Sequence, residues 1–194
     1  MKILVACEES QSVTIELRKL GHEAFSCDIK KATGGHPEWH IQGDVLEQIT
    51  KEWDMLIGFP PCTFLSSVQT HLCRKSIDRT IKRIEAADFF MKLMNADIER
   101  IALENPAGVM KHIFRNPDQT IHPFYFGDRE MKRTCLWLKN LPKLVHYKAA
   151  TLFDEQTHTN RPEPAFTWIN KNGKTKNDYF TYCKNSTERS KTFP

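Results

Sequence analysis

The chain has 194 residues, of which 40% are hydrophobic and 27% charged, and its formal net charge is +4. These values fit one soluble globular domain, and the mildly basic balance suits a polyanionic partner without requiring one. No segment approaches the roughly 18 consecutive apolar residues of a membrane-spanning helix, and the N-terminus shows no signal-peptide pattern. We therefore expect a cytoplasmic protein.

The cysteines predict neither a disulfide framework nor a metal site. None of the six forms a Cys-x-x-Cys pair, and four lie within or beside apolar runs. In a cytoplasmic protein this pattern is typical of reduced thiols. His71 and Cys73 form the only close His–Cys pair, and no second pair with cysteine stands at zinc-ligand spacing. We expect no bound metal.

The first part of the chain predicts a strand, a helix and a second, parallel strand. Residues 2–6 are a short apolar run that predicts a buried strand, and residues 23–29, "EAFSCDI", predict a second strand that ends in Asp28. Between them, apolar side chains recur at helical spacing: Val13, Leu17 and Leu20. Gly21 follows, where a helix commonly ends. In such a unit the two strands are parallel and the connection between them is right-handed.

Ligands of parallel sheets bind at the carboxyl ends of the strands. In the predicted unit these ends carry residues 7–12, Asp28 and Ile29. The sequence therefore places a candidate site at this edge.

The middle of the chain predicts further elements of the same kind. Residues 30–43 contain several glycines and predict a loop. Residues 43–45 end a short strand or form a turn before a small helix over 46–51, and a buried strand is predicted over 54–59. The longest helix is predicted over roughly 76–97, from apolar residues spaced by three or four: Ile77, Ile81, Ile84, Ala87, Phe90 or Met91, Met94 and Ile98.

The rest of the chain predicts two more strands and then irregular structure. Residues 100–106 form a strand, and Pro106 ends it at the first turn of a helix over about 107–114. A further strand is predicted over 134–141, and from about 150 the chain is polar. Strands alternating with helices predict an α/β fold: a mostly parallel central sheet, helices on both faces, and one domain with 150–194 as an irregular tail.

Four polar segments at strand ends share one predicted edge of this sheet: the loop 6–12, Asp28, Cys62 and Glu104. Each has a structural alternative. Asp28 suits a turn, Glu104 with Asn105 suits a helix cap, and free cysteines are commonly buried. Together, a cysteine after two prolines and a carboxylate before Asn-Pro are typical of a nucleophile and an acid.

Five segments resemble motifs of the cytosine-5 DNA methyltransferases, and they occur along the chain in the same order as in that family. "GFPPCTFLSS" at 58–67 is similar to their Pro-Cys motif and "IALENP" at 101–106 to their Glu-Asn-Val motif, and these two are the most specific. "FSCDI" at 25–29 resembles the strand whose terminal acid binds ribose, and "GDVLE" at 43–47 the element that supports adenine. "FGDREMKRTCLWL" at 126–138 resembles their basic strand motif. The closest likeness is to a compact branch typical of phages and prophages.

The resemblance implies a Rossmann-like fold that binds S-adenosylmethionine and methylates C5 of cytosine in DNA. The thiolate of Cys62 adds to C6 of the base, Glu104 holds or protonates N3, and a basic residue, Arg133 or Lys132, steadies O2 or a phosphate. Cysteine suits this step because it both adds and leaves near neutral pH. We expect partial burial to raise the pKa of Glu104. A target base in duplex DNA has to be flipped out.

The resemblance also implies roles for individual residues. Catalytic roles fall to Cys62, Glu104 and Arg133. Cofactor contacts are expected from Cys7, Glu8, Ser10, Gln11, Asp28, Ile29, Asp44, Val45, Phe59 and Pro60. Substrate contacts are expected from Pro61, Thr63, Asn105 and Lys132.

The cofactor loop departs from the family pattern because "VACEESQSV", residues 5–13, has no glycine. We expect polar side chains near the start of the following helix to bind the methionine carboxylate instead: Ser10, Gln11 and Ser12. Glu8 and Glu9 oppose an anion there.

The C-terminal part also departs from the pattern. Only about 50 residues follow the basic strand, too few for a separate target-recognition domain. Readout is expected to be limited or to come from three loops, 30–43, 64–76 and 154–190. Their basic and aromatic residues suit phosphates and unstacked bases, or else form a solvated surface: His36, Trp39, His40, Arg74, Lys75, Arg161, Trp168, Lys171, Lys174 and Tyr179. "NSTERSKTFP" resembles the approach to the family's last motif. We expect either that the helix of this motif is absent or that the chain is a shortened version of the protein.

Three functions stay open from the sequence. The first is methylation of cytosine C5 in DNA, which the resemblance places in the modification of phage DNA against host nucleases. The second is the same transfer to RNA or to a cytosine nucleotide, favoured by the lack of a recognition domain. The third is a non-catalytic protein that binds DNA or the cofactor. The glycine-free loop favours it, and the presence of both Cys62 and Glu104 argues against it.

Overall fold

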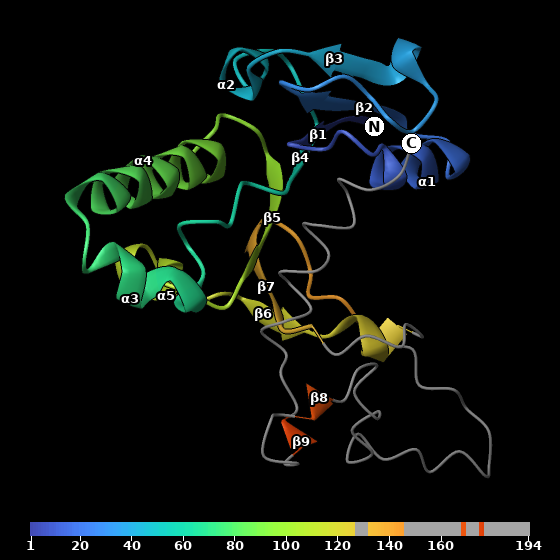
Figure 1. Ribbon diagram of the computed structural model, residues 1–194. Helices are drawn as coiled ribbons and strands as arrows, with labels where there is room; N and C mark the ends of the chain where they lie inside the picture. The colour runs from blue at the N-terminus through green and yellow to red at the C-terminus, as the bar shows by residue number, and fades with distance from the viewer. Residues whose placement is uncertain (127–131, 146–167, 170–174, 177–194) are drawn as a thin grey trace, which may run out of the picture. The chain divides into compact units, whose positions relative to one another are not determined.

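The computed structural model describes residues 1–126, 132–145, 168–169 and 175–176 (Figure 1). The chain divides into two compact units. The first comprises Met1–Ile121 and Arg133–Val145, and the second His122–Lys132 and His146–Pro194. The predicted irregular tail from 150 lies mostly outside the described residues. Within it, β8 (Trp168–Ile169) and β9 (Thr175–Lys176) form an antiparallel pair. The organisation as one domain stays a prediction.

The first unit is built on a seven-stranded sheet with the order β3-β2-β1-β4-β5-β7-β6. The bounds are β1 Lys2–Ala6, β2 Glu23–Asp28, β3 His40–Gln42, β4 Met55–Gly58, β5 Arg100–Pro106, β6 Gln119–Ile121 and β7 Thr134–Lys139. The pairs from β3 to β5 are parallel, and only β7 runs against its two neighbours. The predicted fold class, a Rossmann-like α/β fold with a mostly parallel sheet, is confirmed.

Helices cover both faces of this sheet, as predicted (Figure 1). The helices of the first unit are α1 Ser12–Lys19, α2 Val45–Gln48, α3 Thr70–Cys73, α4 Ile77–Met94 and α5 Met110–Ile113. Side chains alternate along a strand, so Ile3 and Val5 of β1 pack with Leu17 of α1, whereas Leu4 of the same strand belongs to the core on the α4 side. Among the described residues, no helix is both long and apolar enough to cross a membrane.

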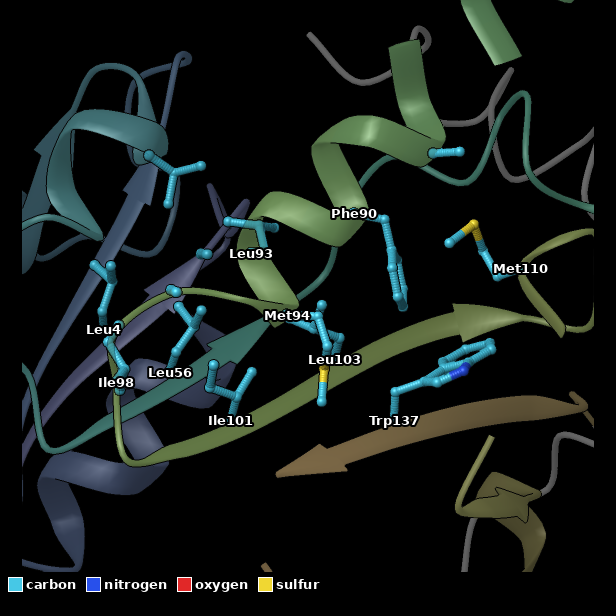
Figure 2. Packing of buried hydrophobic residues seen from close by; sticks show 14 of the residues in the cluster. Leu4, Leu56, Phe90, Leu93, Met94, Ile98, Ile101, Leu103, Met110 and Trp137 are labelled. Atoms are coloured by element: carbon cyan, nitrogen blue, oxygen red, sulfur yellow. The ribbon is translucent and has the colours of Figure 1, made fainter. Parts of the chain in front are cut away.

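The main core lies between the sheet and α4 (Figure 2). Leu4, Leu56 and Ile101 pair across β1, β4 and β5, and all three are fully buried. Phe90 of α4 packs edge to face against Trp137 of β7, with ring centroids 5.1 Å apart. The core thus joins the parallel strands and the reversed strand β7 under one helix.

The helix α4 confirms the predicted element but not the predicted apolar stripe. Ile77, Ile81 and Ile84 are 80%, 48% and 63% exposed, whereas Phe90 and Met94 are buried. The buried face continues toward the N-terminus through Arg83 and Arg79, which precede Phe90 by seven and eleven residues and are half-buried. The first half of α4 therefore turns its arginines inward and its isoleucines toward solvent.

The other differences from the sequence concern short elements. The predicted loop 30–43 contains the 3₁₀ turn η1 (Pro37–Trp39) and the strand β3. The predicted loop 64–76 contains η2 (Ser67–Gln69) and α3, and the helix over 107–114 is reduced to α5. The strand β6 was not predicted. Segments of three or four residues show no periodicity, and pairing with β2 or β7 selects their conformation.

Substitutions on the two faces of α4 test its orientation. We expect Phe90→Ala to lower the free energy of unfolding by about 3–5 kcal/mol, because it leaves a cavity beside Trp137. The matched change Ile84→Ala should alter it by about 0.5 kcal/mol or less, since Ile84 is mostly exposed. Urea unfolding followed by circular dichroism measures both values. Equal losses in the two variants would show that α4 is oriented differently.

Candidate active site

The strand register brings the predicted strand ends to one edge. Ala6 of β1 pairs with Cys27 of β2 on one side and with Gly58 of β4 on the other, and Gly58 pairs with Leu103 of β5. The residues that follow are Cys7, Asp28, Phe59 and Glu104. They therefore line the carboxyl edge of four neighbouring strands. The sheet order reverses between β1 and β4, where ligands of open α/β sheets bind.

The reversed strand β7 adds Arg133 to the same edge. Because β7 is antiparallel to β5, its first residue, Thr134, pairs with Pro106 at the carboxyl end of β5. Arg133 comes directly before Thr134 and is exposed. Lys132, also exposed, belongs to the second unit, so its predicted substrate contact stays a prediction.

The loop after β4 presents Cys62 at the surface. The backbone N–H of Phe59 donates to the oxygen of Ala6 (3.0 Å), and Asn105 Nδ2 donates to the oxygen of Pro60 (2.8 Å). The oxygen of Cys62 accepts hydrogen bonds from Leu65 and Ser66, each at 3.0 Å, which closes a turn. Cys62 is exposed, as are its neighbours on either side: Pro61 and Thr63. The alternative of a buried core cysteine is therefore wrong for Cys62.

A second anchor joins this loop to the segment after β5. The N–H of Val109 donates to the oxygen of Leu65 (2.9 Å), and the N–H of Ser67 donates to the oxygen of Ala107 (3.2 Å). A Cβ atom at Gly108 would overlap the backbone oxygen of Leu65. Only glycine permits this approach, so Gly108 fixes how closely the Cys62 loop lies on the end of β5.

Glu104 and Asn105 are strand residues and do not cap a helix. Both lie within β5, and α5 begins at Met110 after Val109, which makes no side-chain cap. Glu104 is half-buried, with Oε1 shielded from solvent. Asn105 is fully buried, and apart from its bond to Pro60 its Oδ1 has no hydrogen-bond donor in the described part of the chain. The capping alternative from the sequence is therefore wrong.

The carboxylates of Asp28 and Asp44 lie near the thiol of Cys7. Burial, reinforced by Asp28, Cys27 and Asp44, raises the pKa of Cys7 to about 12. Burial together with the same two carboxylates raises the pKa of Cys27 to about 11. Both thiols are therefore mostly protonated at neutral pH, which makes them weak nucleophiles. The structure thus brings together three of the predicted cofactor residues.

The surroundings of these carboxylates combine hydrogen bonds with an exposed apolar group. Asp28 Oδ1 accepts a hydrogen bond from the N–H of Lys30 (2.9 Å), and Asp44 Oδ1 accepts one from the N–H of Leu46 (2.9 Å), which caps α2. Ile29 follows Asp28 and is 75% exposed, whereas Val45 is buried. An exposed aliphatic side chain beside carboxylates suits an amphipathic ligand.

Glu8 caps α1. It is 5% exposed, and its carboxylate accepts hydrogen bonds from Val13 N (2.6 Å), Thr14 Oγ1 (2.6 Å) and Thr14 N (3.3 Å). From the sequence, these N–H groups at the start of the helix are among those expected to bind the methionine carboxylate. Since Glu8 already occupies them, that expectation needs correction: the start of α1 is satisfied by its own chain.

Gln11 fastens the loop after β1 to the loop after β2. Its backbone φ is 58°, and its fully buried side chain donates to His36 O (2.7 Å) and accepts from His36 N (3.1 Å). A Cβ at Gly34 would overlap Ser10 and Gln11. The loop after β2 therefore supplies the glycine that lets the two loops pack closely. Gln11 therefore has a structural partner, while Ser10 stays exposed. Residue spacing gave no sign of this contact.

Cysteine reactivity tests the electrostatics of the edge. At pH 7.5 we expect N-ethylmaleimide to modify Cys62 first among the five described cysteines, because Cys62 is exposed. Cys7 and Cys27 should resist, since pKa values of about 12 and about 11 leave little thiolate. Peptide mapping by mass spectrometry measures each rate, and guanidinium-unfolded protein provides the control in which all become accessible. Labelling of Cys7 as fast as Cys62 would contradict this arrangement.

The role of Glu8 can be separated from that of its neighbour. Glu8→Ala should lower the free energy of unfolding by about 1–2 kcal/mol, because it removes the cap of α1. Glu9→Ala should cost about 0.5 kcal/mol or less, since the side chain of Glu9 makes an exposed ion pair with Lys30, and its hydrogen bonds with Thr33 use the backbone oxygen, which the change keeps. Thermal melts compare the two variants. If Glu9→Ala proved the more destabilising, the capping role of Glu8 would be refuted.

Comparisons with known proteins give likeness in fold only. No family model and no curated protein matches the chain. One similar solved structure, from E. coli, is assigned as a prophage-encoded DNA modification methyltransferase: 12% identity, 70% of this chain and 45% of that one, TM-score 0.45. Others are the bifunctional kinase–methyltransferase WbdD (14%, 74% and 35%, TM-score 0.41) and the 16S rRNA methylase RmtB (13%, 70% and 54%, TM-score 0.36). The chain thus spans about half or less of these three proteins.

Proposed function

We propose that this protein is an S-adenosylmethionine-dependent methyltransferase that methylates C5 of cytosine in DNA through a covalent bond between Cys62 and C6. The observation that carries this proposal is the placement of Cys62. It is exposed at the carboxyl end of β4, on a loop that Asn105 holds to β5 directly beside Glu104. A soft nucleophile at the same sheet edge as a half-buried carboxylic acid suits addition to a ring that must be protonated at the same time.

The cofactor would lie over the ends of β1, β2 and β4. Asp28 would accept hydrogen bonds from the ribose hydroxyls, the exposed side chain of Ile29 would contact adenine, and Asp44 would lie on its far side. Glu8 and Gln11 are occupied by Thr14 and His36, so they would shape the loop from behind. When bound, S-adenosylmethionine supplies an electrophilic methyl group. These residues fit it through carboxylates and an apolar surface.

The chain's own residues account for the steps on the base. The thiolate of Cys62 forms a bond to C6, and the electron pair of the C5–C6 double bond moves into the ring while Glu104 gives a proton to N3. C5 would then form a bond to the methyl group, the electron pair of the broken C–S bond would stay with the cofactor sulfur, and C5 would lose its proton to solvent. The ring electrons expel the thiolate, N3 returns its proton to Glu104, and Cys62 is free again. Each proton and electron pair is thus accounted for.

The remaining edge residues would position the base. Arg133 would neutralise O2 of the pyrimidine or a nearby phosphate, with Lys132 as its neighbour. Asn105 would hold the backbone of Pro60, which keeps the Cys62 turn rigid. Pro61 and Thr63 flank Cys62 at the surface and would contact the sugar or base. DNA is the proposed partner and the cytoplasm the proposed location.

Methyl transfer tests the proposal directly. With methyl-labelled cofactor, label should enter DNA and be lost to background in Cys62→Ala. Glu104→Gln should slow transfer by about 10²–10⁴-fold, because the acid is removed while its shape is kept. Cys73→Ala, a change of a buried cysteine, should retain transfer. Label found only in RNA or in deoxycytidine nucleotides would refute DNA as the substrate, and cofactor binding without any transfer would refute the enzyme.

The covalent step can be tested with a trapped substrate. DNA that contains 5-fluorocytosine has no C5 proton to lose, so the adduct should persist and map to Cys62. Mass spectrometry of the digested complex identifies the modified cysteine. An adduct on another cysteine, or normal turnover of unmodified DNA without any adduct, would show that Cys62 is not the nucleophile.

A further inference from the structure

The inward face of α4 carries two arginines beside the Cys62 loop. The face that buries Phe90 and Met94 continues about two and three turns before Phe90 with Arg83 and Arg79, while the isoleucines of the same part of the helix are exposed. A helix that only contributes to a core would place the isoleucines inward, since burying a charge is costly. Because arginines point inward where isoleucines would be expected, we infer that the guanidinium groups have a function on this face of α4.

Both arginines contact Phe64, two residues after Cys62. Arg83 Nε donates to the backbone oxygen of Phe64 (2.9 Å), and Arg79 Cζ lies 5.7 Å from the centroid of the Phe64 ring. Arg79 Nη2 also donates to Gln69 Oε1 (2.9 Å). The arginines thus hold both the backbone and the side chain of the loop that carries Cys62.

The hydrogen-bonding capacity of this pair is not used up. Nε of Arg79 and Nη2 of Arg83 are shielded from solvent, and neither has an acceptor among the residues that the structure describes. Neither arginine forms an ion pair with a residue that the structure describes. Asp78 is the single acidic residue over 70–84. Two like charges one helical turn apart repel each other, so an anion between them would relieve both the repulsion and the unpaired donors.

We propose that Arg79 and Arg83 bind one phosphodiester group of the nucleic-acid strand that carries the target cytosine. This rests on the function proposed above and specifies its substrate class as a polynucleotide. Guanidinium groups present paired N–H donors that match phosphate oxygens, and both side chains are only half-buried, so part of each still meets solvent. Binding there draws Phe64, and with it Cys62, into a fixed position on the strand. Three further cations close to this pair along the chain are exposed: Arg74, Lys75 and Lys82.

Direct binding tests this pair without any need for turnover. The probe is a fluorescein-labelled, cytosine-containing 12-nucleotide DNA single strand, followed by anisotropy at several salt concentrations. We expect Arg79→Gln/Arg83→Gln to weaken binding by about tenfold or more and to reduce the salt slope by about 0.7, the value for one lost phosphate contact on a single strand. Arg79→Lys/Arg83→Lys keeps the charge but not the paired donors, and should recover the slope with only part of the affinity.

The matched control removes two positive charges at the opposite edge of the sheet. Lys19→Gln/Arg100→Gln changes residues near the start of β2 and in β5, each in an exposed ion pair. This control should bind like the unchanged protein. Circular dichroism melts establish that each variant is folded. If the two glutamine double variants lost affinity equally, or if Arg79→Gln/Arg83→Gln, still folded, bound normally at every salt concentration, the phosphate site would be refuted.

A competition experiment separates the two sources of phosphate. We expect deoxycytidine monophosphate to displace the labelled strand only weakly, with a constant that the arginine changes leave unaltered. Equal loss of nucleotide and strand binding would refute the polynucleotide assignment. Arginine-dependent strand binding without methyl transfer would refute the proposed enzyme while the phosphate site stands. Methyl transfer that does not change in Arg79→Gln/Arg83→Gln would refute the phosphate site while the proposed enzyme stands.

Discussion

The parallel pairing of β1, β4 and β5 is the constraint on which the candidate site depends. It sets Ala6, Gly58 and Leu103 at one level, so the three chains leave the sheet at one edge. β7 then pairs with β5 in the opposite direction, which brings its beginning, Arg133, to that edge as well. A shift of one residue in any of these ladders would turn each side chain to the other face. Chemistry and core packing are therefore fixed by the same hydrogen bonds.

The Cys62 loop is held from three sides without being buried. Asn105 holds Pro60 from the end of β5, Gly108 allows close backbone contact with Leu65, and the arginines of α4 contact Phe64. These contacts restrain the backbone while leaving the thiol exposed. At the same sheet edge, the loop after β1 is held in a different way. Its helix start is capped by Glu8 and its shape is fixed by Gln11, so rigidity there comes from side chains.

Much of the frame could be predicted because it follows from local patterns. The sequence shows the strand patterns of β1, β2, β4 and β5 and the apolar residues that recur at helical spacing along α4. Gly21 follows α1 with the expected positive φ of 83°. Short elements such as β3 and β6 could not be predicted, since their conformation comes from pairing with a distant strand. The inward arginines were missed because three isoleucines at helical spacing gave the stronger signal for a buried face.

The sequence by itself determined the chemical groups and their order: a cysteine after two prolines, a carboxylate before Asn-Pro and an acid at the end of the second strand. Only the tertiary structure decided their surroundings. It made Cys62 exposed while it buried Cys27 and raised the pKa of Cys7, and it engaged Glu8 and Gln11 with the chain itself. The physical reason is that residue type fixes which proton or electron pair a group can exchange. Burial and hydrogen-bond partners, supplied by segments far apart in the chain, decide whether that group is available to do so.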